Sequence, residues 1–414
     1  MWKMIRVATD IMGTGTDGAV FQADATKALP LLEEYRGKLM SLYIDPPYTT
    51  GDKLEYRIPV GEMGYRTGKP YLLTEAYTDR FSDKADYVRL LQGLVGTAHE
   101  LLSDAGTLFL HIDYRASACA RLVLDEIMGE DAFANEIIGA YESGGRATRH
   151  FSRKHDVILM YQKSKRAYFD AMQAAVKQSG TRSNHMKSAV DEAGRRYRSI
   201  KTNGKEYRYY DDALVPPSDV WTDISHLQQR DPERTGYATQ KPLKLLKRIF
   251  AVSSREGDMV GDLCFGSGTS LEAAYGLKRR FLGVDASFSA QAVVRMRMAH
   301  ASFSHYWPSS MEDARLDADV STGEGKITVT LHAFTQTQKG KIIPAEYEVL
   351  PLDGLAQWSL GILRDGKLHV RTGSARSKKS PAIAQTLTML AEEGQLAVEI
   401  MDVMAQKHVF VWAD

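Results

Sequence analysis

"DMVGDLCFGSGTSLEAAYGLKRRFLGVD", residues 258–285, decides the fold. A short apolar run at residues 258–263 predicts a buried strand, and the loop "CFGSGTS" follows it at residues 264–270. "LEAAYGL" (271–277) then predicts a helix and "RFLGVD" (280–285) a second strand. A strand, a glycine loop, a helix and a strand in this order indicate one unit of a parallel α/β sheet.

The loop of this unit has the properties of a ligand-binding turn. Its glycines let the backbone approach a ligand closely, and the helix N-terminus offers free N–H groups. Asp285, at the end of the next strand, can hold two ribose hydroxyls, which suits an adenosine-containing cofactor. A rival loop, "GTGTDG" (13–18), matches G-x-G-x-x-G, but "AVFQAD" after it looks extended. That rival therefore predicts a surface turn, and a dehydrogenase is the least favoured function.

The same alternation of strands and helices extends on both sides. Strands are expected at residues 39–45, 106–113 and 155–163, and helices at 86–104, 116–129 and 241–254. The fold class is therefore α/β, with a doubly wound, mostly parallel sheet. After residue 321 the pattern predicts a small α+β module, with strands at 326–334, 396–403 and 408–412, a hairpin around Asp365-Gly366 and a helix at 380–393.

Composition limits the class of protein. The chain has 414 residues, 25% of them charged, and no apolar run approaches the roughly 20 residues of a membrane helix. The N-terminus lacks the apolar region of a signal peptide. Two cysteines, Cys119 and Cys264, exclude a disulfide scaffold and a four-thiolate zinc site, and no other metal-ligand spacing occurs. A cytoplasmic protein without a membrane partner is expected.

Positive charge gathers in one segment. Between Ser143 and Tyr210 there are 16 Lys or Arg and 5 Asp or Glu, with tyrosines scattered among them. Such a segment suits contact with nucleic acid phosphates, and a solvated insertion is the alternative. The expected phosphate-binding residues are Arg146, Arg149, Arg153, Lys154, Arg182, Lys187, Arg195 and Arg196.

"SLYIDPPYTTGD", residues 41–52, ends a buried strand with a carboxylate, two prolines and an aromatic ring. Ligands of open α/β sheets bind beyond such carboxyl ends. The prolines fix φ, so the Asp45 carboxylate and the Pro46 carbonyl can form a two-acceptor clamp for an exocyclic amine. Tyr48, after Pro47, can stack on a planar base. A simple turn is the alternative explanation.

These motifs together resemble the β class of DNA amino-methyltransferases, in which the catalytic motif precedes the cofactor loop. "LYIDPPYTTG" resembles the catalytic motif, and "TQKPLKLLKRIFAVSSREGDMVGDLCFGSGTS" (239–270) resembles the joined helix and cofactor loop. "RRFLGVDAS" (279–287) resembles the next strand, and segments such as "RHFSRKHDVILMYQKS" resemble methylation subunits of type III-like modification systems. The resemblance covers most of residues 20–300.

The resemblance implies a Rossmann-like methyltransferase fold, S-adenosylmethionine as cofactor and double-stranded DNA as partner. It leaves open whether a restriction subunit and a second copy of the chain also bind. Catalysis would fall to Asp45, Pro46, Pro47 and Tyr48. Cofactor binding would fall to Asp24, Thr239, Gln240, Lys241, Asp262, Phe265, Gly266, Ser267, Gly268, Thr269 and Asp285. The implied parts are a methyltransferase core at 1–164 and 236–320, a target-recognition insertion at 165–235 and the C-terminal module at 321–414.

The cofactor loop departs from the family pattern, which usually has Asp-Pro-Phe before the glycines. Here Asp262, Leu263 and Cys264 stand in those places, and Phe265 comes one position late. Cys264 has no nucleophilic role in the predicted chemistry, because methylation of an exocyclic nitrogen needs no covalent intermediate. His111 and Asp113, at the end of a predicted strand, are expected to make structural hydrogen bonds.

The predicted function is transfer of a methyl group from S-adenosylmethionine to N6 of a flipped-out adenine at a specific DNA site. An aspartate at the first motif position favours adenine, since cytosine-N4 enzymes usually have serine there. The alternatives are a cytosine-N4 methyltransferase, a methyltransferase of RNA, and a DNA-binding protein whose altered loop has weakened its catalysis.

Overall fold

A computed structural model shows the fold. It describes residues 1–48, 53–78, 81, 83–141, 147–177, 186–228, 231–237, 239–310, 314–336, 342–343 and 346–413. No helix within these ranges is long and apolar enough to cross a membrane.

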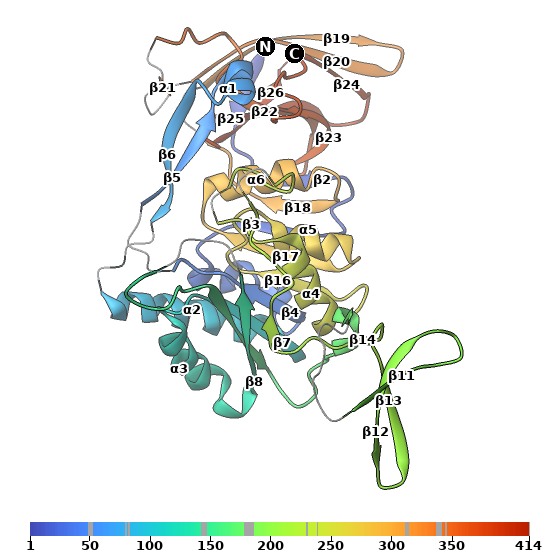
Figure 1. The fold of residues 1–414 in the computed structure, drawn as a ribbon. Helices are drawn as coiled ribbons and strands as arrows, with labels where there is room; N and C mark the ends of the chain where they lie inside the picture. Colours follow the sequence, from blue (N-terminus) through green and yellow to red (C-terminus); the bar gives the residue numbers. More distant parts are fainter. Residues whose placement is uncertain are drawn as a thin grey trace.

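One large sheet runs through the molecule (Figure 1). In the described residues it has 15 strands, and its central part is parallel. The strands, in order across the sheet, are β1 (Trp2–Ile5), β26 (Lys407–Trp412), β25 (Gln395–Asp402), β22 (Leu355–Arg364), β23 (Lys367–Ala375), β2 (Thr9–Met12), β18 (Phe303–Tyr306), β3 (Gly18–Gln22), β17 (Arg280–Asp285), β16 (Met259–Asp262), β4 (Leu39–Ile44), β7 (Leu102–Ile112), β9 (His155–Gln162), β8 (Phe133–Ala140) and β15 (Val220–Trp221).

The parallel part consists of β18, β3, β17, β16, β4 and β7. Its register places Asp262 opposite Tyr43 on one side and Gly283 on the other. Strands β4 and β17 are buried on both faces, which explains the nearly continuous apolar runs that predicted them. The sequence-based fold class, a doubly wound and mostly parallel sheet, is confirmed.

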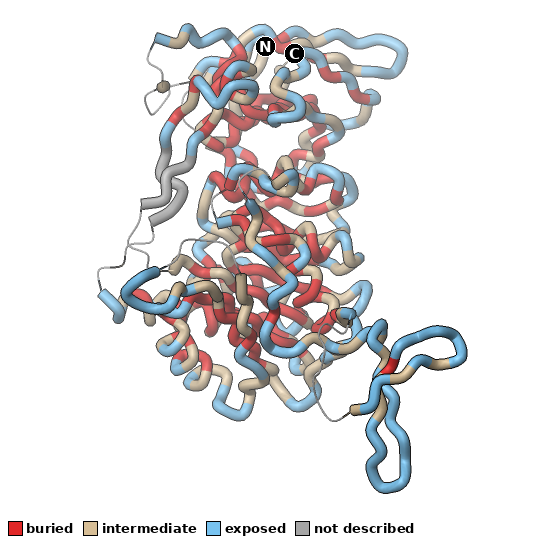
Figure 2. The backbone as a smooth tube through the Cα atoms, viewed as in Figure 1, coloured by how far each residue is buried: buried red, intermediate tan, exposed pale blue. Residues whose placement is uncertain are grey.

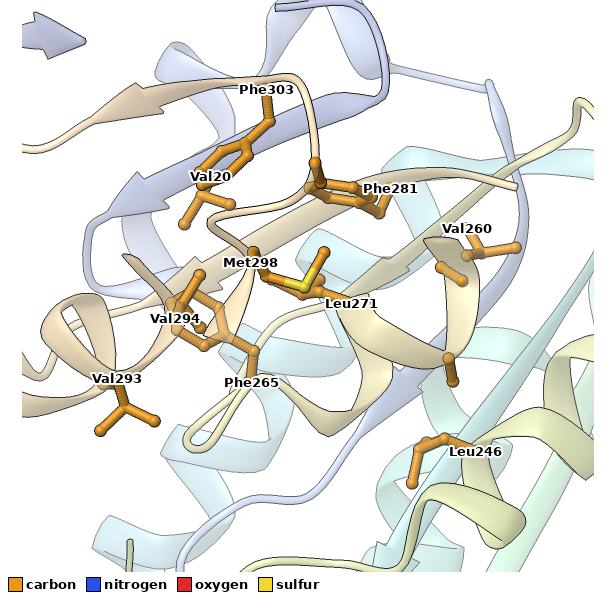
Figure 3. Close-up of a cluster of buried hydrophobic side chains, with 14 of the residues drawn as sticks. Val20, Leu246, Val260, Phe265, Leu271, Phe281, Val293, Val294, Met298 and Phe303 are labelled. Atoms are coloured by element: carbon orange, nitrogen blue, oxygen red, sulfur yellow. The ribbon is translucent and has the colours of Figure 1, made fainter. Parts of the chain in front are cut away.

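Six α-helices lie in the described residues: α1 (Gly61–Thr67), α2 (Lys84–Leu101), α3 (Ser117–Met128), α4 (Leu243–Ser253), α5 (Thr269–Gly276) and α6 (Phe288–Arg297). Helices α4, α5 and α6 share one apolar core with side chains such as Val260, Phe281 and Phe303 from the strands (Figure 3). Helices α2 and α3 share a second core with Leu42 and Leu282. Because successive strand residues point to opposite faces, the sheet separates these two cores.

Helix α2 shows how the sequence produces this layering. Its N-cap Asp83 accepts a hydrogen bond from the backbone N–H of Asp86 at 2.8 Å. The buried positions Leu91, Leu94 and Val95 recur at helical spacing. They form one stripe that packs on the sheet, so the helix is held by its apolar face.

The expected helix at residues 380–393 is wrong. Residues Thr386–Leu390 form strand β24, which pairs with β20 (Lys326–Gln336), itself paired with β19 (Ala314–Gly323). In "TLTML" the apolar residues Leu387 and Met389 are buried and their neighbours are exposed, a period of two that indicates a strand. The described part of the C-terminal segment therefore contains strands and no helix. The predicted hairpin is confirmed, with positive φ at Asp365 and Gly366.

The C-terminal strands continue the main sheet. Strand β2 lies between β18 and β23, and β1 pairs with β26. A cluster of four buried ionic side chains, Asp10, Arg295, Glu399 and Lys407, ties these parts together. The Lys407 ammonium lies 2.8 Å from Asp10 Oδ2, and Arg295 donates to Glu399 at 2.8 Å. Removal of the C-terminal strands would leave Asp10 and Arg295 without these partners.

Two smaller parts flank the sheet. Strands β5 (Lys53–Pro59), β6 (Tyr71–Thr78) and β21 (Ile342–Ile343) form one antiparallel group. The inserted segment contains β10 (Val176–Lys177) paired with β14 (Leu214–Val215), and a ribbon of three antiparallel strands, β11 (Lys187–Val190), β12 (Arg196–Thr202) and β13 (Lys205–Tyr210). This ribbon projects away from the rest of the chain (Figure 1).

Candidate active site

Three aspartates meet at one edge of the parallel sheet. Asp45 follows the last residue of β4, Asp262 ends β16 and Asp285 ends β17, and these strands are neighbours. The carboxyl ends of parallel strands point to the same edge, where open α/β sheets bind their ligands. A pocket of about 460 Å³ lies there.

The pocket brings together nearly all of the predicted catalytic and cofactor residues. Those that line it are Asp24, Asp45, Pro46, Pro47, Tyr48, Thr239, Gln240, Lys241, Asp262, Phe265, Gly266, Ser267, Thr269 and Asp285. Gly268 is not among the lining residues but belongs to the same loop. It has a left-handed φ of 71°, and a Cβ at this position would lie 2.6 Å from Val294 Cγ2, so a side chain there would clash with α6.

Lys241 contacts the catalytic motif directly. Its ammonium donates hydrogen bonds to Asp45 Oδ1 at 2.9 Å and to the Tyr48 hydroxyl at 2.9 Å, and it lies 2.7 Å from Asp45 Oδ2. The Tyr48 hydroxyl also donates to Asp45. Lys241 is brought here because it precedes α4, a helix that packs against β4 and begins at the carboxyl edge of the sheet. Burial beside the Asp45 carboxylate raises the pKa of Tyr48, so its hydroxyl stays protonated.

The glycine loop is held by the aspartate of the neighbouring strand. Asp285 accepts hydrogen bonds from the backbone N–H groups of Gly266 and Ser287, both at 2.8 Å. Asp262 accepts from the N–H of Cys264 at 2.9 Å. Burial raises the pKa of Asp262 to about 7 and that of Asp285 to about 6. These two carboxyl groups therefore titrate near neutral pH.

Phe265 and Cys264, which depart from the family pattern of the cofactor loop, have different surroundings. One packs in the apolar core and borders the pocket, and the other lines the pocket. Phe265 is buried, packs with α5 and α6 residues in the core of Figure 3, and also borders the pocket. Cys264 lines the pocket, and burial raises the pKa of its thiol well above the usual range. A thiol held protonated is a poor nucleophile, which fits the non-catalytic role expected for it.

The remaining predicted cofactor residues, Asp24, Thr239 and Gln240, also line the pocket. Asp24 caps a 3₁₀ turn and accepts hydrogen bonds from the Thr26 backbone N–H and hydroxyl at 3.0 and 2.7 Å. Gln240 accepts from the backbone N–H of Thr235 and donates to the carbonyl of Glu233, both at 2.8 Å. Gln240 thus stabilises its own loop, in which Thr239 has a positive φ of 58°.

The predicted DNA-binding residues lie on two surfaces. Arg153 donates to the Tyr114 hydroxyl at 2.7 Å, at the carboxyl end of β7 and thus at the same edge as Asp45. Arg149 is exposed and Lys154 half-buried near it, whereas Lys187, Arg195 and Arg196 belong to the projecting ribbon. Arg146 and Arg182 lie outside the described residues.

A polar network lies beside the catalytic motif, and sequence reasoning did not identify its members Tyr43 and Asp156. His111 contacts the Tyr43 hydroxyl at 2.7 Å through Nδ1 and Asp156 Oδ2 at 3.4 Å through Nε2. Although burial opposes it, the hydrogen bond from His111 lowers the pKa of Asp156. Asp113 accepts from the Arg115 backbone at 2.9 Å. These bonds fit the structural role expected for His111 and Asp113, and no metal-binding cluster is found in the described ranges.

Arg297 was also missed. It donates to the carbonyl of Ser267 at 3.1 Å and to the hydroxyl of Thr269 at 3.0 Å, and so it supports the glycine loop from α6. Burial lowers the pKa of this guanidinium. No local sequence signal could identify Arg297, because it lies 28 positions from Thr269 in an ordinary helix.

Comparison with known proteins gives the family of this chain. A family model described as DNA methylase, of the N6/N4 type, matches residues 41–293. The type II methyltransferase M.EcaI of Enterobacter cloacae is 25% identical over 72% of this chain and 73% of its own length. The DNA adenine methyltransferase YhdJ of Escherichia coli (strain K12) is 24% identical over 59% of this chain and 70% of its own. The solved structure of the cytosine-N4-specific PvuII DNA methyltransferase aligns with a TM-score of 0.45 and 14% identity, covering 70% of this chain and 89% of that one. Since the family model spans more than half of the sequence, the chain belongs to the N6/N4 DNA methylase family, the S-adenosylmethionine-dependent methyltransferases of DNA.

Proposed function

We propose that this protein methylates N6 of adenine at a specific site in double-stranded DNA. One observation carries the proposal: the carboxylate of Asp45 and the loop held by Asp285 face the same pocket of about 460 Å³. A base clamped at Asp45 and a cofactor bound at the loop would therefore meet inside one cavity. Such proximity supplies much of the rate of a group transfer.

The residues of the pocket fit S-adenosylmethionine. The volume lies within the roughly 300–1,000 Å³ of small-molecule sites. Each oxygen of Asp285 accepts one backbone N–H and keeps lone pairs for ribose hydroxyls. The residues from Asp262 to Thr269 would hold the methionine part, and Asp24 would lie near the adenine. When bound, the cofactor supplies an electrophilic methyl group on a sulfonium.

The target amine would be held by Asp45 and the carbonyl of Pro46, with the base stacked on Tyr48 after flipping out of the duplex. In the structure Lys241 and Tyr48 both donate to Asp45. The incoming amine must therefore share or replace one of these donors. The proton released on transfer would leave to water, with Asp45 as the acceptor that orients the amine.

The rest of the chain would serve DNA recognition. We propose residues 165–235 as the target-recognition insertion between core blocks at 1–164 and 236–320, followed by the module at 321–414. Arg149, Arg153 and Lys154, in the segment that contacts Tyr114 after β7, and Arg196 on the ribbon would contact phosphates. Affinity that rests on such contacts falls steeply with salt.

Cytosine-N4 methylation is the second candidate, because the same clamp can hold the amine of cytosine. Adenine is preferred because aspartate, not serine, stands at position 45. Mass spectrometry of nucleosides separates the two. DNA from a methylation-deficient host is incubated with the protein and S-adenosylmethionine, with Asp45→Ala beside it. The proposal expects N6-methyladenine from the wild type alone. N4-methylcytosine would overturn the base assignment, and equal products from Asp45→Ala would overturn the catalytic assignment.

Further partners belong to the same proposal. A second copy of the chain and a restriction subunit like that of type III-like systems would each change the mass of the complex. Light scattering of the purified protein on its own, and after co-purification from its cytoplasmic host extract, distinguishes a monomer from a dimer and from a complex with another chain.

A further inference from the structure

The projecting ribbon has two chemically different faces. Its hairpin turn, Asn203-Gly204, has positive φ at both residues, the geometry of a two-residue hairpin that fixes register. The register pairs Arg198 with Tyr209 and Ile200 with Tyr207. Because side chains alternate along a strand, the even-numbered residues of β12 share one face with the odd-numbered residues of β13.

On the first face, here called the packed face, the charged side chains interact with acidic and aromatic side chains of the ribbon itself. Tyr197 and Tyr210 pair across the strands with ring centroids 5.5 Å apart. The Arg208 guanidinium lies 4.8 Å from the Tyr197 ring centre and donates to Glu206 at 3.1 Å. Arg195, just before β12, bonds both oxygens of Asp212 and lies over Tyr210. The basic groups of this face are therefore largely neutralised within the ribbon.

The opposite face, here the open face, presents apolar, aromatic and cationic groups together. In β12 and β13 it consists of Arg196, Arg198, Ile200, Thr202, Lys205, Tyr207 and Tyr209. Ile200, Tyr207 and Tyr209 remain 38%, 45% and 40% exposed. Arg198 lies 3.8 Å from Asp211, and within the described chain Arg196 and Lys205 form no ion pair. Figure 2 shows how little of the ribbon is buried.

We infer that the open face binds in a groove of double-stranded DNA and contributes to the choice of the methylated site. This inference rests on the proposed function. Charge complementarity selects the occupant: Arg196, Arg198 and Lys205 place three cations on this face, and one carboxylate, Asp211 just after β13, lies 3.8 Å from Arg198, so the three cations outnumber it. A two-stranded ribbon has the width that the major groove of B-DNA admits. The tyrosine hydroxyls can reach base edges, and Ile200 can contact a thymine methyl group.

The packed face supplies a matched control. Lys201 is exposed like Lys205 and lies in the same hairpin, but the pleat directs it to the packed face, where it stands opposite Glu206 in the strand register. Lys201→Ala and Lys205→Ala remove the same charge from opposite faces. Both positions are exposed and away from the main core, so the thermal midpoints of both variants should stay near that of the wild type.

The first measurement is binding of a fluorescent duplex of random sequence over a range of salt. Arg196→Ala with Lys205→Ala should lower affinity about tenfold and reduce the salt slope by about 2, since each phosphate contact contributes roughly 0.9. Lys201→Ala should change affinity by less than about twofold. Equal effects of Lys201→Ala and Lys205→Ala would overturn the assignment of the face.

The second measurement is the distribution of methylated sites in DNA from a methylation-deficient host. Tyr207→Ala with Tyr209→Ala should broaden the set of methylated sites or lower methylation of the preferred site about tenfold, as expected for lost base contacts. Binding of S-adenosylmethionine should be unchanged. An unchanged site pattern at an unchanged rate would refute the inference while the proposed function stands. Failure of the wild type to methylate any DNA would refute the proposed function, and the binding comparison would still decide which face touches DNA.

Discussion

The ammonium of Lys241 lies 2.7 Å from Asp45 Oδ2, although 196 positions of sequence separate the two residues. The contact joins the start of α4 to the end of β4 and also includes the Tyr48 hydroxyl. The sequence resemblance assigns Lys241 to cofactor binding, whereas its contacts with Asp45 are those expected of a residue that positions this carboxylate. The two roles predict different kinetics.

Replacement of Lys241 separates these roles. Lys241→Met should slow methyl transfer in a single turnover about 10- to 100-fold, because one charged hydrogen bond contributes roughly 1.5–3 kcal/mol. S-adenosylmethionine affinity, measured by calorimetry, should change little, and Lys241→Arg should restore part of the rate. A loss of cofactor affinity with an unchanged transfer rate would instead place Lys241 at the cofactor.

Cofactor binding should depend on pH through Asp285. Burial raises the pKa of this carboxyl to about 6, and only the ionised form offers all its lone pairs to ribose hydroxyls. Affinity for S-adenosylmethionine should therefore fall as pH decreases through about 6. Asp285→Asn should bind at least about tenfold more weakly above that pH and show a flat profile in calorimetry. A wild-type profile that stays flat down to pH 5 would contradict this role.

Stability of the protein without cofactor should depend on pH through Asp262. Burial raises the pKa of its carboxyl from 3.8 to about 7, so the folded chain retains a proton that the unfolded chain has lost. The resulting stabilisation is fully present below pH 3.8 and is lost as pH rises through about 7.

Asp262→Asn removes this titration. Near pH 8.5 the variant should be more stable than the wild type by about 1–3 kcal/mol in urea unfolding, and near pH 5 the difference should shrink. The exposed Asp104→Asn serves as the control and should leave the pH dependence of unfolding unchanged. Parallel pH profiles for wild type and Asp262→Asn would show that Asp262 does not control the effect.

The buried charge cluster should dominate the attachment of the C-terminal strands. Lys407→Met leaves Asp10 buried beside Arg295 Nη1 at 3.7 Å, without its closest partner. The free energy of unfolding should fall by about 3–5 kcal/mol, the usual cost of breaking a buried pair. Lys278→Met removes an exposed pair with Glu256 at 3.1 Å and should cost at most about 1 kcal/mol. Similar losses of unfolding free energy in the two variants would mean that the buried cluster does not hold the C-terminal strands to the rest of the sheet.

Local patterns were sufficient for four of the parallel strands, β4, β7, β16 and β17, and for the aspartates at the pocket. Strands such as β16 and β17 are buried on both faces, so their short apolar runs mark them clearly, and Asp45, Asp262 and Asp285 follow at their ends. Contacts between segments that are distant in the chain have no comparable signal in the sequence. Neither the pairing of Lys241 with Asp45 nor that of Arg297 with the glycine loop can be read from spacing along the chain.

The prediction of secondary structure was wrong in a segment whose sequence fits both the period of a helix and that of a strand. The segment 380–393 contains good helix formers, but "TLTML" alternates, and pairing of Thr328 with Thr388 on the neighbouring strand favours the extended form. The two faces of the ribbon likewise depend on register across the Asn203-Gly204 turn. The count of basic residues identified the inserted segment as a candidate DNA-binding surface. It could not show that Arg196 lies on the open face, whereas Arg195 is already paired with Asp212.

The position of β2 between β18 and β23 has a consequence for how the protein is made. Asp10 leaves the ribosome early, and its partner Lys407 follows 397 residues later. At about 5–20 residues per second, roughly 20–80 s pass before the lysine exists. Through most of that interval β2 has no β23 to pair with, and throughout it Asp10 lacks its lysine partner. The strands that lead to Asp45, Asp262 and Asp285 are made earlier, but the described sheet is complete only when translation reaches β26.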